Sequence, residues 1–385
     1  MKRLLAVLAP LAVAVLLAPE PGLGQFEISS KGATLRIGGR VQFQARRSSC
    51  SAFPVQLPCM EEVPATAWFI RRARLELTVT ISDFIEGRFA PEFAPSTDIL
   101  DETNLTDAYG RLNFSEAVHL QIGHFKRPFD GFQMMSSTQI LTIERDIDIP
   151  GVPSTAALSL DEFTEQFNLS NRNNGIMLTG AVADGGFEYW AGVFNGNSAT
   201  SNNSDADAKQ LIGRVQYSTK VGALPLAVAA AGALSAEPFV RQSGELADET
   251  YSNFELWIQL GDFDGGLIVQ GELFVGQNPL ESKTGMPIDL ADGDEFANAW
   301  ATQAIGGYSF PIHGSRFIQA IEAVLRVTYA DPNTDQDRNE MWGLTPGVQL
   351  FFAERQRIAF NWDFAIFNND LRTVNSFKTQ YQFYF

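Results

Sequence analysis

Apolar and polar side chains alternate through most of the chain, in runs of roughly 9–12 residues that suit a tilted β-strand crossing of a bilayer. The last ten residues show the pattern most clearly. One phase is aromatic apart from a single threonine: Phe377, Thr379, Tyr381, Phe383 and Phe385. The other phase is polar through Lys378, Gln380 and Gln382. A period of two residues is typical of a β-strand with two different faces.

Such a strand cannot easily remain at an exposed edge, because an unpaired apolar edge invites aggregation. The alternative is a strand whose apolar face meets lipid and whose edge pairs with the first strand of a closed barrel. The first alternating run lies at Leu35–Ala45. We therefore expect the last run to pair with it, which would place Lys378 on the same side of the wall as Arg36 and Arg40.

About sixteen alternating runs follow one another between residues 35 and 385, an even number of the kind that outer-membrane barrels use. Short connections such as 82–85, 115–117 and 183–186 alternate with long ones, the longest being 126–173. Tight periplasmic turns and longer outside loops are typical of these barrels. The pattern predicts an all-β, transmembrane antiparallel β-barrel over residues 25–385. Tandem soluble sandwiches are the competing fold, but they would place the apolar phase inside.

The N-terminus has the features of a secretory signal. Lys2 and Arg3 precede an apolar run over residues 4–18, which is short for a membrane helix. Small residues at Gly22 and Gly24 favour removal of residues 1–24, and an uncleaved anchor helix is the alternative. Export to a bacterial outer membrane is the expected location.

Composition excludes some classes of function. The formal net charge of −17 argues against a nucleic-acid partner, which would require a basic face. Two cysteines, Cys50 and Cys59, lie in one stretch between strand-like runs, so export predicts a local disulfide rather than a zinc site, which needs four ligands. No cofactor is expected.

Catalytic patterns are weak. The three histidines form no recognisable Ser-His-acid spacing, so an outer-membrane enzyme is not favoured. Residues 331–337 carry oxygen ligands spaced for calcium but lack the Gly and the terminal Glu of an EF-hand loop, which favours a solvated loop.

If the apolar phase faces lipid, the opposite phase of the first strands lines the interior with arginines. They are Arg36, Arg40, Arg72, Arg74, Arg88 and Arg111. Guanidinium groups bind phosphate or carboxylate through two parallel hydrogen bonds. The alternative is that they only pair with neighbouring carboxylates such as Glu76 and Glu86 and keep the wall rigid.

Several segments together resemble one known family. They are Ile70–Leu75, Thr106–Tyr109, Gly123–Phe129, Ser136–Ser137, Ile143–Arg145 and Gly192–Gly196. This ordered set is similar to the phosphate-selective porin O and P family of outer-membrane channels, over residues 35–196 and weakly beyond. The resemblance implies a 16-stranded barrel, usually a homotrimer, that passes small anions or other small solutes by diffusion.

The resemblance also implies a constriction. In the family the third outside loop folds inward, a role that falls here to residues 126–173, with Lys126, Arg127 and Arg145 as basic residues near the narrowest point. The family's phosphate pores also use lysines from another loop, where this chain offers Arg241 and no Lys. Phosphate-like anions therefore stay one option. A general or weakly cation-selective porin and a non-conducting structural or adhesive barrel remain alternatives. Phe385 resembles the terminal signal through which outer-membrane proteins meet the barrel-assembly machinery.

Overall fold

A computed structural model describes residues 26–30, 32–49, 66–94, 104–149, 152, 159–183, 186–196, 209–240, 243–263, 266–352, 356–368 and 372–385. The predicted signal peptide and the predicted Cys50–Cys59 disulfide lie outside these residues.

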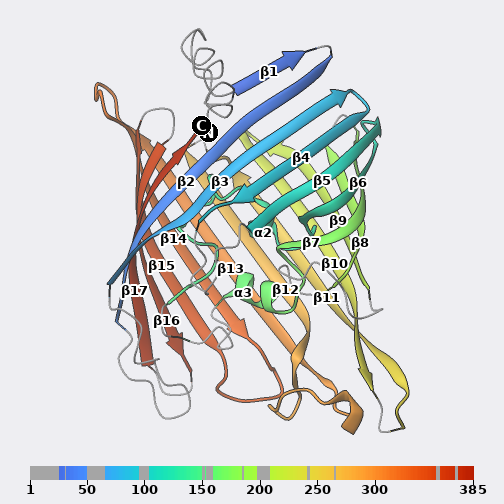
Figure 1. Cartoon of the computed structure of the whole chain (residues 1–385). Coiled ribbons are helices and arrows are strands. Elements are labelled where there is room, and N and C mark those ends of the chain that lie inside the picture. Colours follow the sequence, from blue (N-terminus) through green and yellow to red (C-terminus); the bar gives the residue numbers. More distant parts are fainter. Residues whose placement is uncertain are drawn as a thin grey trace, which may run out of the picture.

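Sixteen long strands of the described chain form a closed antiparallel barrel (Figure 1), as the sequence predicted. They are β2 (Ala33–Ser49), β3 (Thr66–Ser82), β4 (Ile85–Glu92), β5 (Asn104–Ser115), β6 (Val118–Lys126), β7 (Arg172–Val182), β8 (Phe187–Phe194), β9 (Gln210–Val221), β10 (Leu224–Val240), β11 (Leu246–Gly261), β12 (Leu267–Ser282), β13 (Phe296–Pro311), β14 (Ile318–Asp331), β15 (Met341–Phe352), β16 (Gln356–Phe367) and β17 (Arg372–Tyr384). Each pairs with the next, and β17 pairs with β2 to close the ring.

The closing pair is the one expected, although β17 meets residues 40–49 of β2 rather than 35–45. Lys378 lies opposite Arg46, and Tyr384 lies opposite Arg40. An additional short strand, β1 (Phe26–Ser30), pairs with the start of β2 from Phe26 opposite Ile37. The sequence did not predict β1, because a strand of five exposed residues is too short to show a clear alternation of apolar and polar positions.

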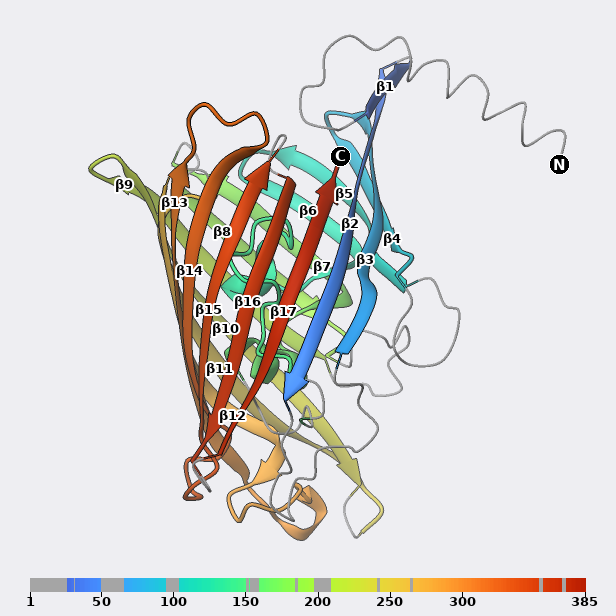
Figure 2. The same cartoon turned by 90° about the vertical axis from the view of Figure 1, so that its left-hand side faces the viewer.

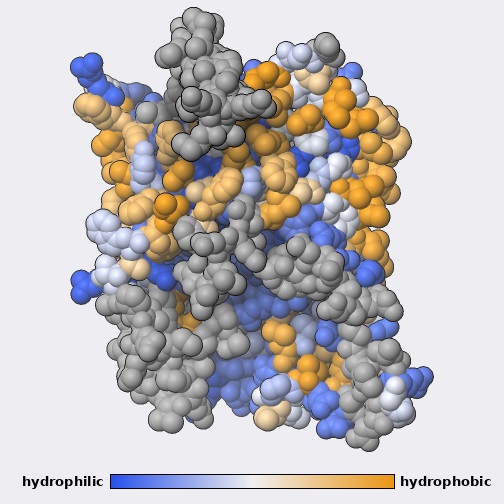
Figure 3. Space-filling model, in the orientation of Figure 1, coloured by the Kyte–Doolittle hydropathy of each residue, from blue (hydrophilic) through white to orange (hydrophobic). Residues whose placement is uncertain are grey.

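The two faces of the strands differ as the alternation predicts. In β17 the side chains of Phe377 and Tyr381 are each 43% exposed, whereas Lys378 and Gln382 are almost fully buried inside the barrel. Figure 3 shows hydrophobic residues over much of the outer strand surface in that view. An outward apolar face and an inward polar face are what a bilayer demands of a strand barrel.

Among the described residues, the short turns after β9 and β13 lie at one end of the barrel and the longer connection after β12 lies at the other (Figure 2). Two long connections that the sequence predicts, 235–250 and 276–299, are shorter than expected. Residues 235–240 and 246–250 pair with each other as extensions of β10 and β11, and β12 continues to Ser282. These extensions carry Glu237, Asp248 and Glu249, so no apolar alternation marked them as strand.

The described residues between β6 and β7, 127–149, 152 and 159–171, are called the inner segment below. They contain α2 (Gly131–Met134) and α3 (Leu160–Gln166), drawn within the ring in Figure 1. Ser159 caps α3 by accepting a hydrogen bond from the Glu162 amide. Phe129 and Phe163 pack against Phe274 of β12, with ring centroids 6.3 and 6.2 Å away. This apolar core attaches the segment to the inner wall.

One further helix, the 3-10 turn η2 (Leu290–Asp292), lies between β12 and β13. Among the described residues, no helix is long and apolar enough to cross a membrane.

Candidate functional site

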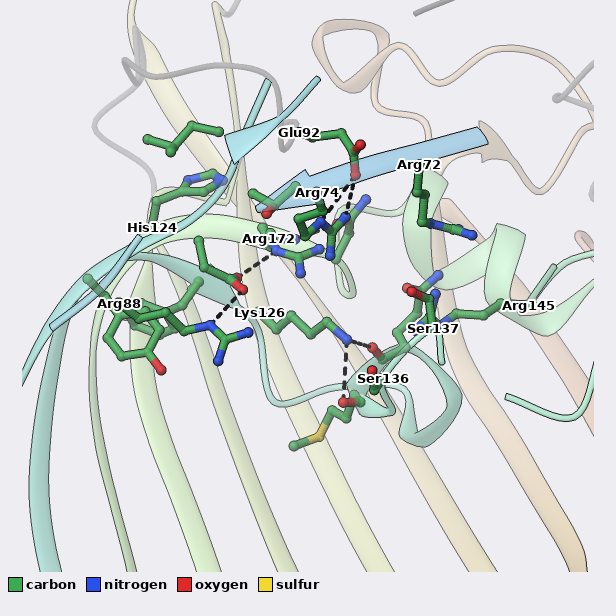
Figure 4. Close-up of a pocket in the computed structure, with 18 of the residues that line it drawn as sticks. Arg72, Arg74, Arg88, Glu92, His124, Lys126, Ser136, Ser137, Arg145 and Arg172 are labelled. Carbon is green, nitrogen blue, oxygen red and sulfur yellow. Dashed lines mark hydrogen bonds and ion pairs between the residues drawn. The ribbon is translucent and has the colours of Figure 1, made fainter. Parts of the chain in front are cut away.

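A cavity of about 590 Å³ lies between the inner face of β2–β6 and the connection that follows β6. Its described lining has nine basic residues against five acidic ones. Figure 4 labels several of them, including Arg74, Arg88 and Glu92. The basic ones are Arg40, Arg71, Arg72, Arg74, Arg88, Arg111, Lys126, Arg145 and Arg172; the acidic ones are Glu92, Asp107, Glu144, Asp146 and Glu165. The site is therefore electropositive within an acidic protein.

The wall arginines share their carboxylate partners. Glu76 of β3 accepts hydrogen bonds from both Arg40 and Arg88, the latter at 2.7 Å. Asp107 of β5 lies 3.4 Å from Arg88 and 2.7 Å from Arg172. A carboxylate shared by two guanidinium groups neutralises only one of them, so positive charge remains at the wall.

The remaining wall cations differ in their partners. Arg74 forms a 3.1 Å ion pair with Glu92. Arg111 donates two hydrogen bonds to the Gln121 amide oxygen, at 2.7 and 3.2 Å. That partner is neutral, and the carboxylate of Glu86 on β4 stands opposite Arg111 in the sheet register without a hydrogen bond to it among the described residues.

A β-bulge adds a cation that alternation alone assigns to the outer face. Gln42 lies opposite Arg72 and Phe43 lies opposite Ile70, so Arg71 is the extra residue of β3. Arg71 and Arg72 therefore both reach one carboxylate, that of Glu144, at 2.8 and 3.2 Å. The bulge explains why phase analysis missed Arg71.

Two further predicted cations reach the cavity, Lys126 from the end of β6 and Arg145 from the β6–β7 connection. The Lys126 ammonium donates to the carbonyl oxygens of Gln133, Met134 and Met135, at 2.8 Å for Met135. Arg145 donates to the Phe132 and Met135 carbonyls, at 2.8 and 2.6 Å. These partners are neutral carbonyl oxygens, and through them both side chains hold the end of α2.

Two of the predicted site residues are not brought into the cavity. Arg127 is buried away from it, where it donates to the Ser170 and Asn168 carbonyls and to Gln210. Arg36 lies at the rim, where its side chain is 57% exposed and pairs with Glu27 of β1. The sequence could not separate these from Arg40 or Arg88, because all lie in polar positions.

The inner segment also binds the opposite wall. Arg326 of β14 donates to the Glu144, Arg145 and Asp146 carbonyls, at 3.2, 2.5 and 2.9 Å. Arg357 of β16 donates to the Ile140 carbonyl at 2.7 Å. These contacts fix residues 140–146 against β14–β16 and leave the basic wall of β2–β5 facing the cavity.

Burial changes the pKa values of the inner segment. Burial alone would raise the pKa of Glu144, but Arg71 and Arg72 outweigh it and hold that pKa well below its usual value. Burial, and next the nearby Asp148, raise the pKa of Asp146 to about 6. Glu144 therefore stays ionised at neutral pH, whereas Asp146 takes up a proton at a higher pH than an ordinary aspartate.

Within the described residues, no group of three or more His, Cys, Asp or Glu side chains is placed to hold a metal ion. The 331–337 loop, whose spacing suggested calcium, is included in that part of the chain.

A closed sixteen-stranded antiparallel barrel with an apolar outside and a charged interior defines the class: an outer-membrane β-barrel of the porin type. The profile of the family described as phosphate-selective porin O and P matches residues 61–239. The resemblance expected from the sequence is confirmed over that stretch.

Solved structures agree on the fold. Pseudomonas putida OprB at high pH has a TM-score of 0.60 and 9% identity, covering 91% of this chain and 94% of that one. The outer membrane channel DcaP of Acinetobacter baumannii has a TM-score of 0.58 and 12% identity, over 94% and 100%. The trimer form of Vibrio cholerae OmpT has a TM-score of 0.55 and 10% identity, over 92% and 100%. At such identities the likeness concerns the fold alone. No curated protein matches the sequence.

Proposed function

We propose that the chain is an outer-membrane porin whose channel passes small anions by passive diffusion. The observation that carries this proposal is the surplus of positive charge in the cavity, nine basic residues against five acidic ones. Anions concentrate where fixed positive charge lines a narrow aqueous path, and cations are repelled. Phosphate-like oxyanions suit the paired hydrogen-bond geometry of guanidinium groups.

Residues 126–173 act as the constriction loop in this proposal. Their anchoring to β14 and β16 through Arg326 and Arg357 supports an aperture bounded on one side by the loop and on the other by the basic wall. The long connections, including this one, would face the outside, and both termini would lie in the periplasm.

Assembly and targeting belong to the same proposal. The trimer form of the similar Vibrio cholerae OmpT supports a homotrimer. The outer strand surface would contact membrane lipid, and Phe385 would meet the barrel-assembly machinery. Residues 1–24 would be removed on export.

Planar-bilayer recording of the purified protein tests the function. In a salt gradient we expect a reversal potential of the sign set by chloride permeation, and a partial block of that current by phosphate. Arg88→Gln together with Arg111→Gln should reduce the anion preference. Arg36→Gln is the matched control, because its side chain is exposed at the rim.

Two alternatives make opposite predictions. A general or cation-selective porin, favoured by the carboxylates of Asp146 and Glu165 in the lining, gives a reversal potential near zero or of the cation sign. A non-conducting barrel, favoured by the many contacts between the inner segment and the wall, gives no current. Either result contradicts anion diffusion as the function.

A further inference from the structure

The cavity has an apolar side as well as a basic one. Besides Leu105 of β5, its lining holds four apolar side chains from the neighbouring strands β5 to β8: Tyr109, Phe125, Met177 and Trp190. We call these four residues the aromatic patch. Phe125 and Met177 are nearly buried, but Tyr109 and Trp190 are only partly buried and keep exposed surface.

Packing explains only part of this patch. Phe125 lies edge-to-face with Tyr109 and with Phe194, at centroid distances of 5.9 and 5.7 Å, and belongs to the core that attaches the inner segment. That role needs the buried members. It does not need aromatic surface turned toward an interior that is polar in porins, because apolar area left in water gains nothing for the fold.

The exposed aromatic surface adjoins two arginines of the wall. Tyr109 lies directly opposite Arg88 in the β4–β5 register, and the Arg111 guanidinium is 5.8 Å from its ring centroid. Arg111 is held by the neutral Gln121 amide. Among the described residues, none forms a hydrogen bond with the Tyr109 hydroxyl, so this donor is available at the edge between patch and charge.

We propose that the cavity selects aromatic carboxylates: anions whose carboxylate binds at Arg88 and Arg111 while their ring packs against Tyr109 or Trp190. This inference rests on the proposed anion channel and names its preferred class of solute. A planar ring gains contact area with the patch and orientation from the ring edges. Acetate and inorganic phosphate offer the charge without that surface.

The test measures block of the chloride current by benzoate and by acetate, two monocarboxylates that differ in the ring. We expect half-block by benzoate at a concentration roughly three- to tenfold lower than by acetate, as an aromatic contact would give. An anion-selective current in which the two block alike overturns this inference alone. A cation-selective current or none overturns it together with the proposed function.

Substitutions locate the effect. Tyr109→Leu and Trp190→Leu keep an apolar side chain for packing but remove the ring. The benzoate advantage, defined as the half-block concentration of acetate divided by that of benzoate, should therefore fall toward one, while block by acetate stays unchanged. Tyr308→Leu and Trp342→Leu, on the outer face where these residues are 48% and 52% exposed, are the matched controls. An unchanged benzoate advantage in both patch variants would overturn the assignment. The wild-type comparison decides the matter even if a patch variant does not fold.

Discussion

The backbone of Phe385 exchanges two hydrogen bonds with Gly39 of β2. The Gly39 amide donates to the Phe385 carbonyl at 2.9 Å, and the Phe385 amide donates to the Gly39 carbonyl at 3.0 Å. The Phe385 ring lies over Gly39. It also contacts the ring of Phe26 on β1, with 6.5 Å between the two ring centroids. The seam of the barrel is the edge of β2 that pairs with β17. Where β17 ends, β1 pairs with the rest of that edge, from Ile37 toward the start of β2.

Gly39→Ala is expected to weaken this seam. A Cβ at position 39 would lie 2.8 Å from the Arg74 carbonyl oxygen and 2.8 Å from the Phe385 ring, closer than real Cβ atoms come. The cost should be about 1–3 kcal/mol, typical of overpacking. A lower midpoint in heat unfolding of the detergent-solubilised barrel would measure it.

Gly306→Ala on β13 is the control, because nothing lies within 4 Å of the added Cβ. Equal unfolding midpoints for the Gly39 and Gly306 variants would contradict this prediction, because they would mean that the seam accommodates the added methyl group at no cost.

Glu144→Gln is expected to raise anion preference and lower stability together. Glu144 is the shared partner of Arg71 and Arg72, so removing its charge leaves two guanidinium groups without a carboxylate. Loss of one partner from a buried ion pair costs about 3 kcal/mol. The reversal potential should move further toward the anion limit while the unfolding midpoint falls.

Glu27→Gln serves as its control, because that carboxylate pairs with Arg36 at the exposed rim. A Glu144 variant that loses stability without any change in reversal potential would place the ion pair outside the conduction path.

Arg127 and Arg145 should separate stability from selectivity. The sequence places both near the constriction, but only Arg145 lines the cavity. Arg127→Gln should therefore destabilise the inner segment, whose carbonyls at Ser170 and Asn168 it binds, and leave the anion-to-cation permeability ratio unchanged. Arg145→Gln should lower that ratio. A lowered ratio in the folded Arg127 variant would mean that its charge is felt in the cavity.

Much of the fold could be predicted from alternation, because lipid outside and water inside impose a two-residue period on every strand. The site was less accessible. Phase analysis found Arg40 and Arg88 but missed Arg71, since an inserted bulge residue changes the face on which a side chain lies. The sequence also predicted one location, the constriction, for both Arg127 and Arg145. In an irregular segment no local pattern indicates which side chain will be buried by the backbone around it.

The last prediction concerns pH. Burial, and next the nearby Glu255 carboxylate, raise the pKa of Asp130 to about 6 from its usual 3.8. Other charges around it are Glu272 of β12, Asp161 of α3, and Arg145, while Arg214 of β9 pairs with Glu255. A carboxyl with a raised pKa binds its proton more tightly in the folded state. Its contribution to stability is therefore fully present below about pH 3.8 and is lost as pH rises through about 6.

Asp130→Asn tests this contribution, because an amide can still accept from the Gln133 amide and contact Thr164. The shift of about two pKa units corresponds to roughly 3 kcal/mol. We expect the variant to match the wild type at about pH 3, below the unfolded pKa of 3.8, and to unfold at a higher temperature at pH 7.5. Asp83→Asn, in an exposed turn, should follow the wild type throughout. If the difference between variant and wild type is the same at both pH values, Asp130 is ionised in the folded barrel and the inner segment tolerates its charge.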